Sequence, residues 1–238
     1  MRLYHQCNNR ENCLLLFGGF AAHPSHFLPF IPQGYDCIIV YHYRHLDFSA
    51  LKALLKEIGK ESKITLLGFS MGVFAARVFL ESLQDDLQGE SQDFMRRDSA
   101  KEDSLNFVRK IAINGTEFGI HLKFGILPRL FKLTQKSFDL ESFKCNLFGE
   151  FLDKANDFVF RDSKVLREEL GFFIQSCAQF DKLTNTILWD QAIISKQDLV
   201  FNPEAQRAFW DSYRRERDKS NQILEIDAPH FAFFKWQL

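Results

Sequence analysis

The sequence predicts an α/β fold in which helices cover both faces of a mostly parallel β-sheet. Short apolar runs, typical of buried strands, fall at residues 14–17, 36–41 and 64–67. Between them, residues 48–58 carry apolar side chains at the three- and four-residue spacing of a helix. Strands that alternate with helices indicate a parallel sheet buried on both sides. A chain of 238 residues can bury one large core, so we expect a single domain over residues 1–238.

The second half of the chain is expected to complete the sheet around a helical insertion. Its predicted elements are a strand over residues 108–114, a strand over 186–194, a helix over 203–217 with Asn202 as N-cap, and a strand over 223–226. Residues 119–185 carry helical stripes without strand-like runs, which predicts an inserted helical lid. The core would then comprise residues 1–118 and 186–238, with a mobile, charged insertion over 84–104.

Bulk composition excludes several classes of function. The formal net charge is -1, with 46% hydrophobic and 26% charged residues, so no global charge favours nucleic acid or membrane. No apolar run is long enough to cross a bilayer and no signal-peptide core follows Met1, so we expect a cytoplasmic protein. The 5 cysteines lack zinc-ligand spacing and are expected to be reduced, with no metal bound.

The pattern with the clearest chemical meaning is Gly-x-Ser-x-Gly at residues 68–72. It lies between an apolar strand and a helix of small residues, which is the context of a nucleophile elbow. The elbow is a strained turn that exposes a serine hydroxyl, here that of Ser70. Glycine is needed at both ends of the turn because side chains there would collide with the adjacent strand and helix. The alternative is a glycine-bearing turn with an idle serine.

A nucleophilic serine needs a general base, and the base needs an orienting acid. In folds with this serine turn the acid and then the histidine follow the serine in the chain. After Ser70 the histidines are His121 and His230, and only His230 follows a predicted terminal strand. The acid candidates are Asp190, Asp198, Asp211, Asp218 and Asp227. Asp198 is favoured because it follows the carboxyl end of a strand, where ligand crevices open.

Two backbone N–H groups are expected to stabilise the oxyanion of such a reaction. One is that of Met71, directly after the nucleophile. The other should come from the glycine-rich loop after the first buried strand, from Gly19 or Phe20. The sequence thus predicts a serine hydrolase with Ser70, Asp198 and His230 as catalytic residues and Gly19 and Met71 at the oxyanion.

With these motifs in place, the chain resembles the BioG-type pimeloyl-acyl carrier protein methyl ester esterases, a branch of the α/β-hydrolases that serves biotin synthesis. The resemblance includes residues 17–20, 68–72, 113–116, 124–128, 143–149, 189–198 and 228–231. Relatives tend to carry Gly-Trp-Gly where this chain has Gly18-Gly19-Phe20. The resemblance implies an α/β-hydrolase fold, the same roles for Ser70, Asp198 and His230, and no cofactor.

The resemblance also implies a substrate and a partner. The substrate would be pimeloyl-acyl carrier protein methyl ester, and we expect Phe20, Phe143 and Phe148 to contact its acyl chain. Acyl carrier proteins are acidic, so their docking face should be basic. Five basic residues against two acidic ones lie between His121 and Leu147, and we expect the carrier protein at Lys123, Arg129, Lys132 and Lys136, with Lys144 nearby.

Two alternatives remain open at the level of sequence. The same three residues can serve another carboxylic-ester or thioester hydrolase, because the triad does not specify the acyl group. The chain could also be a catalytically silent hydrolase fold that serves as an interaction module. For the esterase we expect a monomer that binds neither nucleic acid nor membrane.

Overall fold

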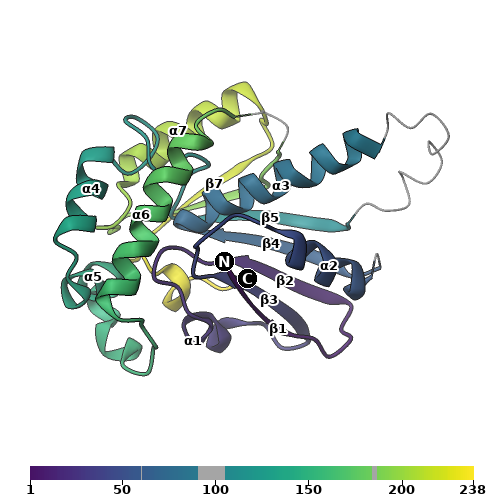
Figure 1. Cartoon of the computed structure of the whole chain (residues 1–238), viewed down its shortest axis with the longest axis horizontal. Coiled ribbons are helices and arrows are strands. Elements are labelled where there is room, and N and C mark those ends of the chain that lie inside the picture. Colours follow the sequence, from purple (N-terminus) through teal and green to yellow (C-terminus); the bar gives the residue numbers. More distant parts are fainter. Residues whose placement is uncertain (60, 91–104, 184–186) are drawn as a thin grey trace.

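The computed structural model describes residues 1–59, 61–90, 105–183 and 187–238. Within these ranges seven strands form one sheet in the order β1-β3-β2-β4-β5-β6-β7, and all neighbours pair in parallel except β1 with β3 (Figure 1). The strands are β1 (Arg2–Gln6), β2 (Asn12–Phe17), β3 (Tyr35–Tyr41), β4 (Lys63–Phe69), β5 (Phe107–Ile113), β6 (Gln191–Ser195) and β7 (Gln222–Ile226). The predicted fold class is confirmed.

Helices and short 3-10 turns connect these strands. They are α1 (Pro24–Phe27), η1 (Leu28–Phe30), α2 (Ser49–Ile58), α3 (Met71–Glu90), α4 (Pro128–Lys136), α5 (Leu140–Phe148), η2 (Gly149–Ala155), α6 (Ser163–Gln179), α7 (Pro203–Glu216) and η3 (Ala232–Phe234). Asn202 caps α7 by accepting from the Glu204 amide at 2.8 Å. No helix in the described ranges combines the length and apolar character that a membrane span requires.

Alternation along the strands divides the core into two layers. On β2, Leu15 and Phe17 face one side of the sheet, while Leu14 and Leu16 face the other. The first side packs against α2, α3, α6 and α7. The second packs against α1, part of α5 and the C-terminal segment that contains η3. Helical segments therefore cover both faces, as the apolar strand runs predicted.

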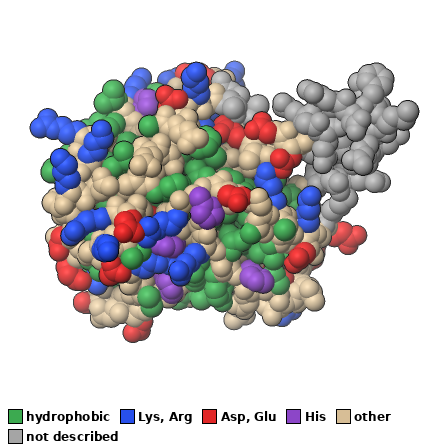
Figure 2. Space-filling model, in the orientation of Figure 1, with side chains coloured by type: hydrophobic (Ala, Val, Ile, Leu, Met, Phe, Trp, Pro, Cys, Tyr) green, Lys and Arg blue, Asp and Glu red, His purple; other side chains and the backbone are tan. Residues whose placement is uncertain are grey.

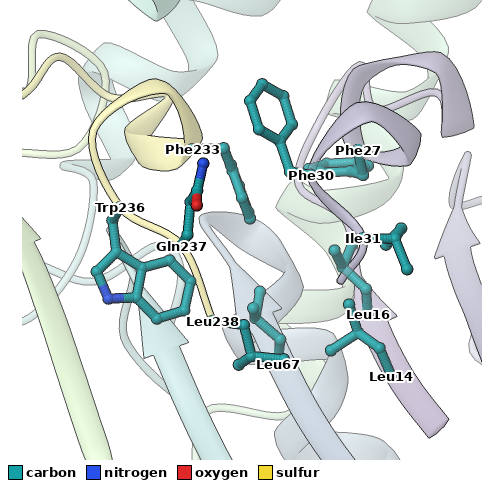
Figure 3. A pocket seen from close by; sticks show the side chains of 10 residues that line it. All are labelled: Leu14, Leu16, Phe27, Phe30, Ile31, Leu67, Phe233, Trp236, Gln237 and Leu238. Carbon is teal, nitrogen blue, oxygen red and sulfur yellow. The ribbon is translucent and has the colours of Figure 1, made fainter. Parts of the chain in front are cut away.

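The C-terminal segment closes the second face with few gaps. Figure 3 shows the small space between it, β2, β4 and η1, which has a volume of about 10 Å³. That is room for a single water molecule at most. Its lining is almost entirely apolar: Leu14, Leu16, Phe27, Phe30, Ile31, Leu67, Phe233, Trp236, Gln237 and Leu238. This pocket is a packing feature of the core and not a ligand site.

Helices α4, α5 and α6 lie between β5 and β6 in the chain and gather at one end of the sheet (Figure 1). We call residues 119–183 the helical insertion. Its helices match the predicted stripes: Phe131 on α4, Leu147 on α5, and Leu166 and Leu170 on α6 are all buried. Because α4, α5 and α6 contribute side chains to the space beside Ser70, the insertion covers the serine turn.

Two local features differ from the sequence-based prediction. Helix α3 continues to Glu90, beyond its predicted end near residue 83, so the charged segment begins inside a helix. An ion pair of 2.7 Å between Lys52 on α2 and Asp86 ties this extension to the body of the protein. The rest of the predicted insertion, residues 91–104, lies outside the described residues. Strand β1 was not predicted, because its five residues are largely polar and lie at the sheet edge.

Candidate active site

Ser70 occupies the turn between β4 and α3 in a strained conformation. Its φ is +56°, a left-handed value that is uncommon for a residue with a side chain. The two flanking glycines permit it. A Cβ on Gly72 would overlap the carbonyl oxygen of Phe17, and one on Gly68 would lie 2.9 Å from the Cα of Val73. The strand and helix thus pack too closely around the turn for any larger residue.

Asp198 lies in the loop after β6, at the carboxyl end of that strand. Its Oδ1 accepts from the amides of Val200 (2.8 Å) and Phe201 (2.7 Å). Its Oδ2 accepts from Nε2 of Gln206 at 3.1 Å and from the imidazole of His230 at 2.7 Å. Four donors therefore hold a fully buried carboxylate in one orientation.

His230 follows β7, and its side chain is buried beside Asp198. A carboxylate can only accept, so Nδ1 of His230 carries the proton at 2.7 Å from Oδ2, and Nε2 is left as an acceptor. The imidazole also packs against the ring of Phe69, with centroids 5.1 Å apart. His230 and Ser70 line the same cavity, and no hydrogen bond joins their side chains among the described residues. The structure thus brings the three predicted catalytic residues to one site.

Asn114 is a site residue that sequence reasoning did not assign. It lies directly after β5 with a φ of +49°. Its side chain bridges two loops: Oδ1 accepts from the Ser195 amide (2.7 Å), and Nδ2 donates to the Ser195 hydroxyl (2.8 Å) and to the carbonyl oxygen of His230 (2.5 Å). Asn114 therefore fixes the backbone that carries His230. The sequence signal was its place in the motif at residues 113–116.

Gly19 comes close to Ser70 from the loop after β2. A Cβ on Gly19 would lie 2.8 Å from the Cβ of Ser70 and 3.3 Å from its Oγ, so only glycine allows this approach. Met71 begins α3 directly after the serine. The two backbone amides expected at the oxyanion therefore belong to a residue packed against Ser70 and to the residue that follows it in the chain.

A cavity of about 130 Å³ opens at Ser70. Its lining is mostly apolar, with four polar side chains from Ser70, Thr134, Asn146 and His230. The apolar residues are Phe20, Phe69, Met71, Ile126, Phe131, Phe143, Leu147, Leu170, Leu199 and Val200. Phe20 and Phe143 meet edge to face, with centroids 5.1 Å apart. Such a lining suits an apolar acyl chain.

Phe148 is not at the cavity, which corrects the expectation that it contacts substrate. It is fully buried in the second core layer, where its ring packs against those of Phe158, Phe160 and Phe231. Phe143 and Leu147 turn toward the cavity from the same helix, α5. The structure therefore gives Phe148 a packing position on a different face of that helix.

The basic residues expected to dock a partner lie on the surface of the helical insertion. Arg129, Lys132 and Lys136 are exposed on α4, and Figure 2 shows Lys and Arg side chains at the edge of the molecule where Figure 1 places that helix. Within the described residues none of these three forms an ion pair. Lys123 lies over the ring of Phe124, 4.8 Å from its centroid. Lys144 is paired with Glu141 at 2.8 Å.

The same helix exposes apolar side chains between its charges. Leu130 and Leu133 are more than half exposed, while Phe131 and Thr134 of α4 line the cavity. Leu199 lines the cavity from the opposite loop and is 72% exposed. Helix α4 therefore carries exposed apolar and basic side chains and also contributes two residues to the cavity lining. No group of three or more His, Cys, Asp or Glu side chains is placed to bind a metal ion in the described part of the chain.

Comparison with solved structures shows which proteins share this fold. The crystal structure of BioG from Haemophilus influenzae superposes with a TM-score of 0.76 at 22% identity, covering 99% of this chain and 96% of that one. A lipase-esterase related protein from Clostridium acetobutylicum gives a TM-score of 0.59 at 14% identity, covering 97% and 92%. No family model matches the chain.

A curated relative matches in sequence. It is a malonyl-[acyl-carrier protein] O-methyltransferase of Bacteroides fragilis, 29% identical over 232 residues. The match covers 93% of this chain, which spans 40% of the length of that relative. The fold, the serine turn and these likenesses agree: the chain has the α/β-hydrolase fold, and the resemblance to BioG predicted from its motifs is confirmed.

Proposed function

We propose that this chain is a serine carboxylesterase that hydrolyses the methyl ester of pimeloyl-acyl carrier protein methyl ester, in biotin synthesis. The observation that supports it most strongly is that four separate loops meet around Ser70. Ser70 and His230 line the cavity, Asp198 is bonded to His230 at 2.7 Å, and the Gly19 backbone lies against Ser70. Nucleophile, base and oxyanion donors in this arrangement are the requirements of acyl transfer.

In the proposed reaction the Nε2 of His230 takes the proton of the Ser70 hydroxyl as Oγ attacks the ester carbonyl. Asp198 holds the imidazole and stabilises the imidazolium that forms. The amides of Gly19 and Met71 donate to the oxyanion, and His230 returns the proton to the departing methoxide, which leaves as methanol. Water, deprotonated by His230, then attacks the acyl-serine and releases the free acid. No metal or organic cofactor takes part.

The choice of substrate rests on the resemblance to BioG and on the relative from Bacteroides fragilis. That relative is named for O-methyl transfer to a malonyl group on an acyl carrier protein, and such a transfer produces a methyl ester on a carrier-bound acid. The cavity supports the same choice, because its lining is mostly apolar and its residue Leu199 is exposed at the surface. An acyl chain could therefore enter from a carrier docked outside.

The proposed docking face for the carrier protein is the exposed side of α4 with Lys123. Arg129, Lys132 and Lys136 supply positive charge, and Leu130 and Leu133 supply apolar area beside the cavity. An acidic protein would be attracted to this face by its charge and held by the apolar contacts. A face of this kind beside the cavity suits a substrate that is attached to a protein.

Growth of a biotin-requiring bacterial strain that lacks its own pimeloyl ester esterase tests the proposal. Wild type should restore growth on biotin-free medium and Ser70→Ala should not, because the variant lacks the nucleophile. Failure of the wild type to restore growth, with the protein expressed and folded, would contradict the proposed substrate.

Labelling with a fluorophosphonate separates the enzyme from a silent interaction module. Wild type should be labelled and Ser70→Ala should remain unlabelled, because the probe reacts with an activated serine. Equal absence of label from both would contradict any serine-hydrolase function. Preference for a carrier-protein thioester over the terminal ester in a substrate series would favour a thioesterase instead.

A further inference from the structure

A buried tyrosine contacts the peptide that precedes the Gly19 amide. The hydroxyl of Tyr43 donates to the carbonyl oxygen of Gly18 at 2.9 Å, with a longer contact of 3.4 Å to the carbonyl of Val40. The Gly18 carbonyl and the Gly19 N–H belong to the same peptide plane. In a trans peptide they point in opposite directions, so a bond that fixes one fixes the other.

The Gly18–Gly19 segment needs such support because it contains two glycines in a row. Glycine has the widest choice of backbone conformations, so the peptide between two of them can rotate more freely than any other. The Gly18 amide is already held by the carbonyl of Val40 at 2.8 Å. The hydroxyl of Tyr43 supplies the second bond, and it acts on the peptide unit that carries the Gly19 amide.

Tyr43 is itself held in place by contacts with helix α6. Its backbone amide donates to Oε1 of Glu169 on α6 at 2.9 Å, and its ring packs against Phe173 of the same helix with centroids 5.2 Å apart. Burial raises the pKa of Tyr43 well above 10, so the phenol remains protonated and can donate throughout the working pH range. The helical insertion thereby reaches the glycine loop through this side chain.

We propose that Tyr43 is a positioning residue that aims the Gly19 amide at the oxyanion formed on Ser70. This inference rests on the proposed serine-hydrolase function. Donors at an oxyanion stabilise charge that develops in the transition state, so their aim affects the rate more than ground-state binding. A tyrosine that only fills the core would contribute to stability and leave the rate of the folded enzyme unchanged.

Tyr43→Phe removes the hydroxyl and keeps the ring. With p-nitrophenyl butyrate as a carrier-independent substrate, we expect kcat and kcat/KM to fall together by about 10-fold, with KM changed by less than about 2-fold. The fall should stay below the roughly 100- to 1000-fold that follows complete loss of an oxyanion donor. Affinity for a trifluoromethyl ketone, which forms a tetrahedral adduct with the serine, should fall by the same factor as kcat/KM.

Tyr213→Phe is the matched control. Tyr213 is also a buried tyrosine whose hydroxyl bonds to the backbone, donating to Ile187 (3.1 Å) and accepting from Trp189 (2.6 Å), and it lies outside the cavity. It should lose a similar amount of thermal stability while keeping wild-type kcat. Unchanged kcat in Tyr43→Phe, or an equal fall in both variants, would overturn the positioning role. An inactive, unlabelled wild type would instead contradict the proposed function.

Discussion

The carboxyl group of Glu169 is a buried acid without an ion-pair partner among the described residues. It lies on α6 with one oxygen bonded to the Tyr43 amide at 2.9 Å, while Oε2 has no hydrogen-bond partner among the described residues. Burial raises its pKa to about 7. The Tyr43 amide, Arg161, the Ala21 amide and Arg44 oppose that rise by favouring the ionised form.

The raised pKa predicts a pH dependence of stability that Glu169→Gln should remove. The unfolded carboxyl has a pKa of about 4.5, so between pH 4.5 and 7 the folded state binds the extra proton. The contribution of this group to the free energy of unfolding is therefore fully present below pH 4.5. It falls as pH rises from 4.5 and is lost once pH has passed through 7. The glutamine variant should therefore gain about 2 kcal/mol relative to wild type between pH 5 and pH 8.

Urea unfolding of both proteins across that pH range measures the effect. The midpoint difference between variant and wild type should grow with pH, and Glu168→Gln serves as the control. Glu168 is a neighbour on the same helix that makes an exposed ion pair with Arg44 at 2.5 Å. A constant difference between Glu169→Gln and wild type would contradict a raised pKa at Glu169.

Among individual residues, those with fixed places in a motif could be predicted from the sequence. Ser70 follows from the glycines around it, and Asp198 and His230 follow from chain order and from the strand ends. The positions of three other residues could not be predicted. Asn114 and Glu169 bond to residues more than 80 positions away in the chain, and Tyr43 bonds to a backbone carbonyl that no sequence pattern marks. Phe148 was misplaced because periodicity does not tell which of two buried faces a side chain joins.

At the scale of elements, the helical insertion contributes half of the residues that line the cavity. Its helices α4, α5 and α6 were predictable from their apolar stripes, since each must bury one side against the core. The edge strand β1 was not, because edge strands carry polar residues and lack a buried pattern. The extension of α3 was not predicted, because Asp85 and Asp86 are exposed and interrupt the apolar pattern of the helix.

Helix α4 is expected to contribute to binding only when the substrate is attached to a carrier protein. Lys132→Glu reverses one exposed charge on the proposed docking face, so KM for the carrier-bound ester should rise about 3- to 10-fold at low salt. The effect should shrink as ionic strength increases, because salt screens exposed charges. Hydrolysis of p-nitrophenyl butyrate should be unchanged.

Lys56→Glu provides the comparison for this prediction. Lys56 is an exposed lysine in the last turn of α2, and it carries the same charge away from the cavity. Steady-state kinetics on both substrates should show wild-type values for this variant. An equal rise in KM for the two variants would mean that net charge, and not the α4 face, attracts the carrier.

For the molecule as a whole, the sheet places the three proposed catalytic residues, and the helical insertion supplies side chains to the cavity beside them. Parallel strands β4, β6 and β7 all end at the same edge, so Ser70, Asp198 and His230 meet although they are separated in sequence. This architecture was predictable from the alternation of strands and helices. The substrate was not, because a serine, histidine and aspartate in this arrangement are compatible with many acyl transfers.

The most direct test of the central claim is mass spectrometry of an intact carrier protein that bears the pimeloyl methyl ester. After incubation with the wild-type enzyme, the carrier should lose the mass of one CH₂ group, because a methyl ester becomes a free acid while the thioester remains. Ser70→Ala should leave the mass unchanged. Loss of the whole acyl group, or no change with the wild type, would contradict the proposed activity.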